Sequence, residues 1–546
     1  MQKYLSIQFL KNIGGAFGAI VFCVTLQAQT AKDTADKVEQ IFARYKPQNP
    51  GAQLTVSKNG VILFSKAWGM ANLENNIAMS MNNVTEAGSV SKQFTAAAIL
   101  MLEAQTKLSL DDDIRKYIPE MPDYGVPITI KHLMHHSSGL RDWGSIAELA
   151  GWPRTTKTYH NEDALEIIVR QKTLNNKPGD EFGYSNSNFN LQSLIVERVS
   201  GMTLAEFCNK TIFTPAGMSQ TEWRDNFKKI VPNRAIAYEK KSGTYYTDMP
   251  NEYVYGHGGL LTTTEDLCKW VDFYSSAKLG GPALLKKQIE TDNFNDSTKN
   301  VYAAGLRILK AKGYDVYRHN GATASYRASL EYFPQVGLTI AGLSNTSEFD
   351  SSYDAFSQLE DIFLPAKSIA VKPAELKLDT AKLSLFAGAY RAVKSGEGLK
   401  ISFEKGRFFG NNFPLLAIAQ NIFRFGADVL MFDPSGCIRL VNSDRDTLIY
   451  LPAEKANLTP SLLQQYAATW HSNETASDLK IVVENNKLRL YLHPYKFYEL
   501  TPVYKNGFII EGLGGTVYFE RKKSGRFTSM KASISRARNV VFTRIK

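Results

Sequence analysis

The sequence predicts an α+β domain followed by two small antiparallel β-barrel domains. In the first 365 residues, strand patterns lie at both ends and helical patterns lie between them, which is typical of an α+β fold. After Pro365 the helical patterns fade, and short alternating strands separated by Gly, Asn and Asp take over. Within this second part, two segments align without a gap at an offset of 80 residues, which indicates a duplicated unit. The domains are therefore placed at 30–366, 376–455 and 456–546, after a leader at 1–29.

The leader has the pattern of a secretory signal. Lys3 and Lys11 precede an apolar run over 13–26, and small residues near Ala28–Thr30 suit cleavage. The run is too short for a membrane span, so we expect a secreted, periplasmic protein with no stable membrane span in its mature form. Lipidation of Cys23 is the alternative, although bulky residues precede it.

Composition narrows the class of partner. The chain has 546 residues, of which 44% are apolar, and this apolar content is enough for several ordinary cores. Its net charge is +11. The charge is spread along the chain, so nucleic acid is not an expected partner. The stretch 521–546 is the most basic; solvated strand faces explain it, and attraction to an anionic envelope surface is the alternative. The mature chain keeps Cys208, Cys268 and Cys437, an odd and sparse set that indicates no disulfide framework. The sequence does not specify an oligomeric state.

The elements of the first domain follow from local patterns. Asn59-Gly60 between two alternating runs predicts a hairpin of 53–58 with 61–68. Thr129 suits a helix N-cap, and Thr263-x-x-Asp266 resembles a capping box. We further expect helices at 33–45, 89–104, 163–171, 190–198 and 353–363, and strands at 314–319, 328–333 and 337–344. Strands from both ends would then share one antiparallel sheet.

The second part repeats itself. Residues 386–390 align with 466–470, and 399–404 align with 479–484 at the same offset. Each copy is about 80 to 90 residues of short strands, a size that suits a small antiparallel barrel.

The first candidate catalytic residues are Ser89 and Lys92. Their spacing of three places both side chains on one face of a helix, one turn apart. A serine hydroxyl becomes a useful nucleophile when a neighbouring group takes its proton. Lysine can do so if its surroundings disfavour the charged form.

Two further motifs follow in order. Tyr184-x-Asn186 comes after a Pro-Gly turn, and His319-x-Gly321 ends a short strand. With these motifs the chain resembles the penicillin-recognising serine hydrolases, which include class C β-lactamases, D-alanyl-D-alanine carboxypeptidases, D-aminopeptidases and related esterases. Segments 128–140 and 258–267 also match, so the resemblance covers about 35–365. It implies a β-lactamase/transpeptidase-like fold, and the duplicated part is similar to the lipocalin-like barrels of D-aminopeptidases.

The resemblance implies a role for each motif residue. Ser89 would attack, while Lys92 and Tyr184 would move its proton to the leaving group. Asn186 would bind Lys92 and the substrate amide. The N–H groups of Ser89 and Ala322 would form the oxyanion hole, and Gly321 would let the substrate backbone approach the strand.

His319 separates the members of the superfamily. Class C β-lactamases usually carry Lys-Thr-Gly here, and an imidazole grips a carboxylate less firmly than lysine does. We therefore expect a serine hydrolase that forms an acyl-enzyme with small amides, peptides with an N-terminal D-residue, or esters. A β-lactamase, or a D-Ala-D-Ala carboxypeptidase acting on cell-wall fragments, is the enzymatic alternative. A catalytically inactive envelope-binding protein is the other alternative.

No cofactor or metal is expected. His132, His135 and His136 invite a zinc interpretation, but no carboxylate sits at a matching spacing, and the superfamily uses no metal. Trp143, together with the aromatic residues at 152 and 159, is expected to wall the cleft, with plain packing as the alternative. We expect the barrels to limit substrate access through a loop, with 394–398 and 511–515 as candidates.

Overall fold

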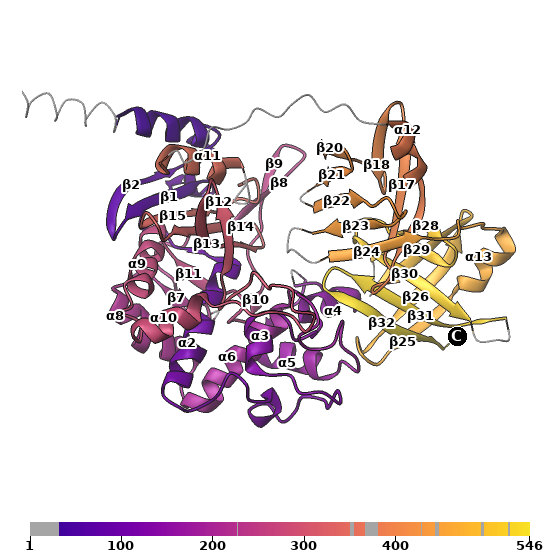
Figure 1. Cartoon of the computed structure of the whole chain (residues 1–546), viewed down its shortest axis with the longest axis horizontal. Helices are drawn as coiled ribbons and strands as arrows, with labels where there is room; N and C mark the ends of the chain where they lie inside the picture. Colours follow the sequence, from indigo (N-terminus) through magenta and orange to yellow (C-terminus); the bar gives the residue numbers. More distant parts are fainter. Residues whose placement is uncertain are drawn as a thin grey trace, which may run out of the picture.

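The computed structural model describes residues 32–545 except 155, 227, 350–353, 366–379, 427, 443–446, 493–495 and 522–524. The leader predicted at 1–29, including Cys23, lies outside the described residues, and the domain boundaries stay predictions. Figure 1 shows an α+β body on one side and two β-barrels on the other. Among the described residues, no helix is long and apolar enough to cross a membrane.

A six-stranded sheet forms the centre of the α+β body. Its first strand pairs with its last in chain order, with Ala52 opposite Ser344, which confirms that segments from both ends close the sheet. At the predicted hairpin, Asn59 and Gly60 have φ of 49° and 77°, the left-handed pair that a type I′ turn requires. The strand order is β12 (Arg307–Ala311), β13 (Tyr314–Thr323), β14 (Tyr326–Phe333), β15 (Leu338–Ser344), β1 (Ala52–Lys58), β2 (Val61–Trp68).

Helices cover both faces of this sheet. The helix at 32–42 and α11 (Asp354–Phe363) share a core with alternate residues of β1. On the other face, Thr55 of β1 contacts Thr264 at 2.8 Å, the first residue of helix α9 (Thr264–Ser275). The remaining helices are α2 (Lys92–Ala104), α3 (Ile130–Met134), α4 (Trp143–Leu149), α5 (Asn161–Val169), α6 (Asn186–Ser200), α7 (Leu204–Cys208), α8 (Thr214–Ala216), α9 (Thr264–Ser275) and α10 (Gly281–Ile289).

Of the two predicted helix caps, one forms completely and the other only in part. Thr129 caps α3 in a full capping box with His132. Thr263 accepts the N–H of Asp266 at 3.2 Å, but the Asp266 carboxylate turns away to Thr221 at 2.9 Å. Only half of the second capping box therefore forms, because a distant hydroxyl competes for the carboxylate.

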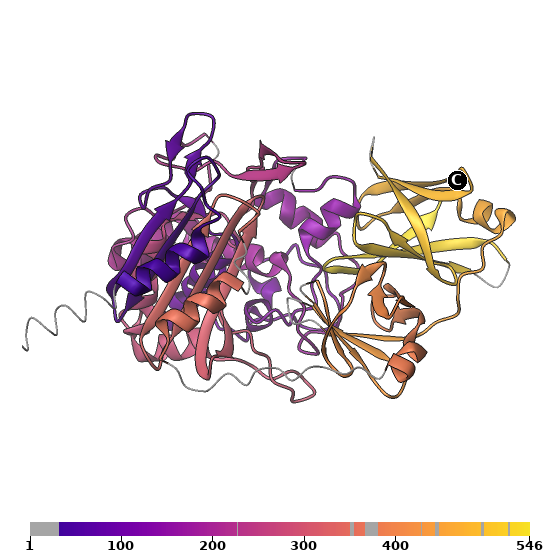
Figure 2. The same cartoon turned by 90° about the horizontal axis from the view of Figure 1, so that it is seen from above.

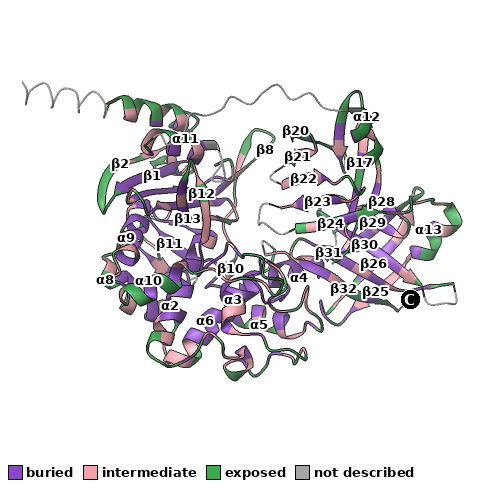
Figure 3. Ribbon diagram, viewed as in Figure 1, coloured by how far each residue is buried: buried purple, intermediate pink, exposed green. Residues whose placement is uncertain are grey.

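The central helix α2 is buried along most of its length, as its purple ribbon in Figure 3 shows. Phe94 packs on Trp270, with ring centroids 4.5 Å apart. The expected helix over 89–104 begins as a tighter turn, a 3₁₀ segment at Gly88–Ser91, and becomes α-helical at Lys92. The first motif thus lies at the junction of two helix types.

Both C-terminal units are antiparallel sheets that curl on themselves. The second closes completely. In the first, the two edge strands β19 (Phe413–Pro414) and β20 (Leu416–Ala419) are separated by Leu415 alone, so the sheet bends until its edges nearly meet. The strands of the first unit are β16 (Gly388–Ala392), β17 (Gly398–Glu404), β18 (Arg407–Gly410), β19 (Phe413–Pro414), β20 (Leu416–Ala419), β21 (Ile422–Phe425), β22 (Asp428–Phe432), β23 (Ile438–Val441) and β24 (Thr447–Pro452). Those of the second are β25 (Ala468–Ser472), β26 (Ser477–Glu484), β27 (Lys487–Leu492), β28 (Lys496–Tyr504), β29 (Gly507–Ile510), β30 (Gly515–Arg521), β31 (Phe527–Ile534) and β32 (Ala537–Arg544).

The sequence repeat is confirmed in the register of these sheets. Gly388 pairs with Ile401 in the first unit, and Ala468 pairs with Ile481 in the second. Both partners are displaced by the same 80 residues. A short helix precedes each first strand: α12 (Thr380–Leu383) and α13 (Pro460–Tyr466).

The second barrel is docked on the α+β body, as the view in Figure 2 also shows. Its apolar core is continuous with the core of the helices. At the interface, the fully buried Arg141 side chain donates to Glu474 at 2.5 Å and to the carbonyl of Arg538 at 3.0 Å. Because a buried charge is tolerated only when it is paired and hydrogen-bonded, this contact fixes the barrel in one orientation.

Candidate active site

The first motif places a serine against a buried lysine. Ser89 lies in the 3₁₀ turn and Lys92 in the first turn of α2. The Lys92 Nζ lies 3.1 Å from the Ser89 Oγ. The lysine side chain is fully buried, whereas Ser89 is partly exposed. A substrate can therefore reach the hydroxyl while the amine stays shielded from water.

Two carbonyl groups orient the Lys92 amine. Nζ donates to Asn186 Oδ1 at 2.9 Å and to the backbone carbonyl of His257 at 2.7 Å. Neither oxygen can donate in return. In a neutral amine, both hydrogens are then engaged by these oxygens, and the lone pair faces the Ser89 hydroxyl. This is the orientation that a base needs to accept the serine proton.

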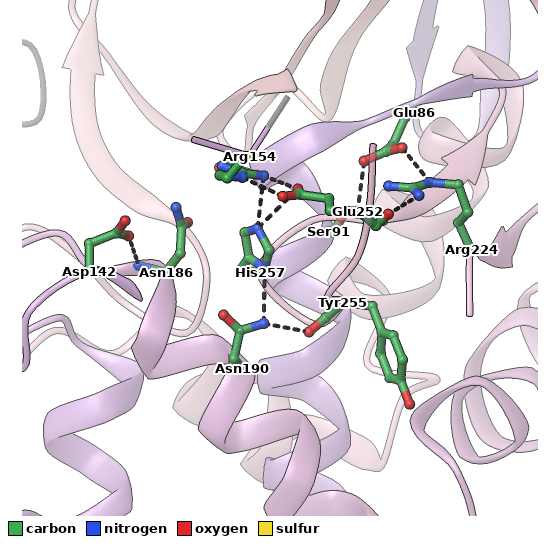
Figure 4. Close-up of polar contacts among 12 residues, drawn as sticks. Glu86, Ser91, Asp142, Arg154, Asn186, Asn190, Arg224, Glu252, Tyr255 and His257 are labelled. Carbon is green, nitrogen blue, oxygen red and sulfur yellow. Dashed lines mark hydrogen bonds and ion pairs between the residues drawn. The ribbon is translucent and has the colours of Figure 1, made fainter. Parts of the chain in front are cut away.

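The His257 carbonyl is held by a buried charged network, drawn in Figure 4. The His257 ring lies 3.0 Å from Asn190 Nδ2 and 3.2 Å from an Arg154 nitrogen, and Arg154 pairs with Glu252. Burial, helped by the charge of Arg154, lowers the pKa of His257 to about 4, although Glu252 opposes the shift. The ring is thus neutral near pH 7. Burial acts to raise the pKa of Glu252, but Arg154 outweighs it and holds that pKa below its ordinary value.

A second buried ion pair continues this network. Arg224 Nε donates to Glu86 at 2.8 Å, and the other Glu86 oxygen accepts the N–H of Gly259 at 3.2 Å. The segment between Glu252 and Gly259 is therefore pinned by charged groups at both ends. Rigid support of this kind fixes the carbonyl that faces Lys92.

The ring of Tyr184 lies close to the Lys92 amine. Its ring centroid is 4.9 Å from Lys92 Nζ and 4.3 Å from the ring of His136. Burial, followed by the charge of Lys92, lowers the pKa of His136 well below its ordinary value. The neutral His136 ring accepts from Asn188 at 2.9 Å and supports the tyrosine from beneath.

Asn186 begins α6, and Asp142 sets its position. The Asn186 N–H donates to one Asp142 oxygen at 2.7 Å, while the other oxygen caps α4 through Ser145 at 3.0 Å. One carboxylate thus joins the starts of two helices. The side-chain amide of Asn186 is left to face Lys92.

Strand β13 runs against the nucleophile turn. A Cβ on Gly321 would overlap the carbonyl oxygen of Ala87 and lie 3.1 Å from the Ser89 nitrogen. A Cβ on Gly88 would lie 2.6 Å from the Ala322 nitrogen. The two expected oxyanion donors therefore sit on adjacent segments. Gly321 is needed for the protein's own backbone to pass the turn, a different reason from the substrate approach expected from the sequence.

We expect Gly321→Ala to lower kcat/KM for any good substrate at least about 100-fold, because the strand must move away from the nucleophile turn. Overpacking of this kind also destabilises a fold by about 1–3 kcal/mol, which a urea titration will measure. Gly388→Ala is the matched control, since a Cβ there lies 3.9 Å from its nearest neighbour and the repeat carries Ala468 at that place. Unimpaired turnover by Gly321→Ala would contradict the close approach.

His319 is buried and bonded within the protein. Its Nε2 lies 2.8 Å from the Tyr302 hydroxyl, and its Nδ1 lies 2.6 Å from the Asn320 carbonyl. A carbonyl can only accept, so Nδ1 carries a hydrogen and Nε2 accepts from Tyr302 when the ring is neutral. The Tyr184 and His319 ring centroids lie 6.3 Å apart, and the donation expected from His319 to Tyr184 or to a substrate stays a prediction. No sequence motif pointed to Tyr302 as the partner of His319.

The second barrel places a residue at the site that sequence reasoning missed. Arg536 lies in the turn between β31 and β32, and its guanidinium carbon is 4.5 Å from the centroid of the Tyr184 ring. Of the two loops expected to reach the cleft, the first places Lys394 against Glu181, with which it pairs. The second, at 511–515, belongs to the turn between β29 and β30.

Burial decides between the two interpretations of Trp143. Trp143 is fully buried and packs against Tyr159 at 5.3 Å, so it belongs to the core and does not line a cleft. Of the clustered histidines, His136 supports Tyr184 as described above. Among the residues that the structure describes, no group of three His, Cys, Asp or Glu side chains could hold a metal ion.

This arrangement can carry out acyl transfer. The Lys92 amine is oriented to take the Ser89 proton, and Tyr184, the expected proton donor to the leaving group, has its ring centroid 4.9 Å from that amine. The backbone N–H groups near Ser89 and Ala322 can stabilise an oxyanion. Five of the predicted residues therefore gather around Ser89 and its lysine: Lys92, Tyr184, Asn186, Gly321 and Ala322.

Comparison with known proteins agrees with this geometry. The Beta-lactamase family model matches residues 34–361. The D-aminopeptidase of Brucella anthropi is 25% identical over 460 residues, covering 82% of this chain and 84% of that protein. The D-aminopeptidase of Gluconobacter oxydans is 26% identical over 353 residues, covering 64% of this chain and 65% of that protein.

Solved structures show the same fold over nearly the whole chain. The octameric penicillin-binding protein homologue from Pyrococcus abyssi has a TM-score of 0.54 and 19% identity, covering 94% of this chain and 99% of that one. The family match spans more than half of the residues and includes Ser89, Lys92, Tyr184 and His319. The chain therefore belongs to the Beta-lactamase family and is a serine hydrolase.

Proposed function

We propose that this protein is a secreted hydrolase that cleaves short peptides and small amides, with preference for an N-terminal D-residue, through an acyl-enzyme at Ser89. The observation that carries the proposal is the Lys92 amine, which bridges Ser89 and Asn186 at 3.1 and 2.9 Å. A hydroxyl oriented against an amine inside a buried pocket is an activated nucleophile.

The relatives support the choice of substrate. Proteins named D-aminopeptidase match this chain over most of its length, and they extend into the barrel region. A protein that shared only the catalytic fold would not need two further barrels, one of which here reaches the site. The D-residue preference rests on these relatives.

Hydrolysis of β-lactams is the weaker candidate. The lysine that β-lactamases carry in the third motif is replaced by His319, and both ring nitrogens of His319 are bonded within the protein. The strand therefore offers no side chain comparable to that lysine for a β-lactam carboxylate.

The test is a substrate panel with purified protein. We expect D-alanine p-nitroanilide and D-alanyl peptides to be cleaved at least about tenfold faster, in kcat/KM, than their L-counterparts and than a chromogenic cephalosporin. Mass spectrometry of rapidly quenched mixtures should show the acyl group on the peptide that contains Ser89. A marked preference for the cephalosporin, or for L-substrates, would overturn the proposal.

A further inference from the structure

We propose that His136 is a positioning residue for the reaction: it binds the backbone on both sides of Tyr184 and so fixes the expected proton donor to the leaving group. In the sequence this histidine stands out only through the zinc interpretation of its cluster. The inference rests on the proposed acyl-enzyme chemistry at Ser89, but it does not depend on which acyl group the enzyme prefers.

His136 contacts the chain immediately before and immediately after Tyr184. Its backbone carbonyl accepts the N–H of Gly183 at 2.8 Å. Its ring Nδ1 accepts the N–H of Ser185 at 3.3 Å. Between these two bonds, the ring centroids of His136 and Tyr184 lie 4.3 Å apart. One residue therefore holds the tyrosine through the backbone on both sides and through its ring.

The hydrogen bonds behind the ring decide which nitrogen of His136 carries the hydrogen. Ser138 Oγ accepts the N–H of Leu140 at 3.1 Å and donates to Asn188 Oδ1 at 2.6 Å. The amide nitrogen of Asn188 therefore faces His136 and donates to Nδ1 at 2.9 Å. Because two donors point at Nδ1, this atom is unprotonated and the hydrogen lies on Nε2. Only this neutral form of the ring can hold the N–H of Ser185.

Burial keeps the ring in that neutral form. His136 is fully buried, and the ring centroids of Phe182, Phe189 and Tyr302 lie 5.8, 5.2 and 4.6 Å from its own. Burial lowers the pKa of the imidazole well below its ordinary value, because apolar surroundings disfavour the charged form. The contact with Ser185 is therefore present near neutral pH.

The backbone of His136 is in an uncommon conformation. Its φ is 53°, in the left-handed region that residues other than glycine adopt at a cost. Such a conformation persists where the surrounding structure imposes it, and it is typical of functional sites. Here it accompanies the arrangement in which the carbonyl and the ring of one residue bind the same segment, 183–185.

The position of Tyr184 matters most for a poor leaving group. As the Ser89 oxygen bonds to the acyl carbon and the leaving oxygen or nitrogen departs, that atom takes the proton of the Tyr184 hydroxyl. The transfer requires a hydrogen-bond distance between the two atoms, and a displacement of about 1 Å can cost about 100-fold in rate. A leaving group that is stable as an anion needs no such proton.

The experiment compares two esters that share one acyl group. The leaving group of methyl butyrate needs a proton, whereas p-nitrophenolate leaves p-nitrophenyl butyrate without one. His136→Phe keeps a ring beneath Tyr184 but offers no acceptor to Ser185. We expect its kcat/KM to fall about 100-fold for methyl butyrate and less than about fivefold for p-nitrophenyl butyrate.

A conservative variant should rescue the activity. His136→Asn places an amide oxygen where Nδ1 lies, and asparagine tolerates the left-handed backbone. Since the bond to Ser185 is kept, its kcat/KM for methyl butyrate should fall less than about tenfold.

Two controls separate positioning from stability. His135→Phe removes the neighbouring buried imidazole, whose Nδ1 lies 3.4 Å from Asp292, and should keep the ratio between the two esters within about twofold of wild type. In a Tyr184→Phe background, His136→Phe should cost less than a further threefold or about that on methyl butyrate, because an effect transmitted through Tyr184 disappears with its hydroxyl. Thermal melts of all variants report folding.

Equal losses on the two esters in His136→Phe, or the full loss repeated in the Tyr184→Phe background, would overturn the proposal. A folded His136→Asn that loses about 100-fold on methyl butyrate alone would also overturn it, even if the Phe variant does not fold. The esters contain no amino acid. A wild type that cleaves them but not D-alanyl peptides therefore overturns the proposed substrate and leaves the role of His136 standing.

Discussion

Ser89→Ala should fold normally and lose turnover by about a million-fold, the scale seen when the nucleophile of a serine hydrolase is removed. The change deletes one partly exposed oxygen whose partner here is the Lys92 amine at 3.1 Å. Stability should change little, because the amine keeps its bonds to Asn186 and His257. Steady-state kinetics and fluorophosphonate labelling followed by peptide mapping measure the result.

The control for this variant is a serine two residues away. Ser91 is fully buried and its Oγ accepts the N–H of Leu260 at 3.3 Å. Ser91→Ala should therefore stay labelled and active, with only a modest loss of stability. Labelling of Ser89→Ala at any other serine would show that the nucleophile has been misplaced.

Lys92→Arg should lower the rate of acylation about 1,000-fold or more, the upper range for loss of a general base. Arginine stays protonated, so it has no lone pair to offer Ser89. Its larger head must also fit where three oxygens now surround one nitrogen. The second-order rate of probe labelling, compared with a thermal melt, gives acylation and folding separately.

Lys92→Met guards against misfolding of the arginine variant. The ring centroids of Tyr184 and Phe189 lie 4.9 and 5.6 Å from the Lys92 Nζ. A methionine side chain fills the same space between these rings and buries no charge. It should melt near the wild-type temperature and still fail to acylate. If a folded Met variant acylates at the normal rate, the lysine is not the base.

Short sequence patterns predicted the parts of the structure that neighbouring residues determine. The spacing of Ser89 and Lys92 holds because one helical turn sets it, and the Asn59-Gly60 turn holds because both residues tolerate positive φ. The repeat offset predicted the barrel register because equivalent strands pair alike. These features depend on residues close together in the chain or on copies of one unit.

The rest of the site depends on contacts that leave no local mark. His257 contributes its backbone carbonyl, and any residue type has one. Arg536 belongs to a basic stretch that suggests solvated strand faces, and only the docked barrel brings it onto Tyr184. Trp143 sits in a loop-like, aromatic-rich segment, yet tertiary packing draws it fully inside.

The Arg141–Glu474 contact also sets an order of events during synthesis. The two residues are 333 positions apart, so at about 5–20 residues per second the ribosome needs roughly 15 to 70 seconds to pass from one to the other. Throughout that interval the guanidinium has no Glu474 to meet and must remain in water. The loop that carries Arg141 and the adjoining Asp142 therefore cannot settle until the second barrel emerges and docks. Ser89 is therefore synthesised early, whereas the site around it is completed only after the second barrel has docked.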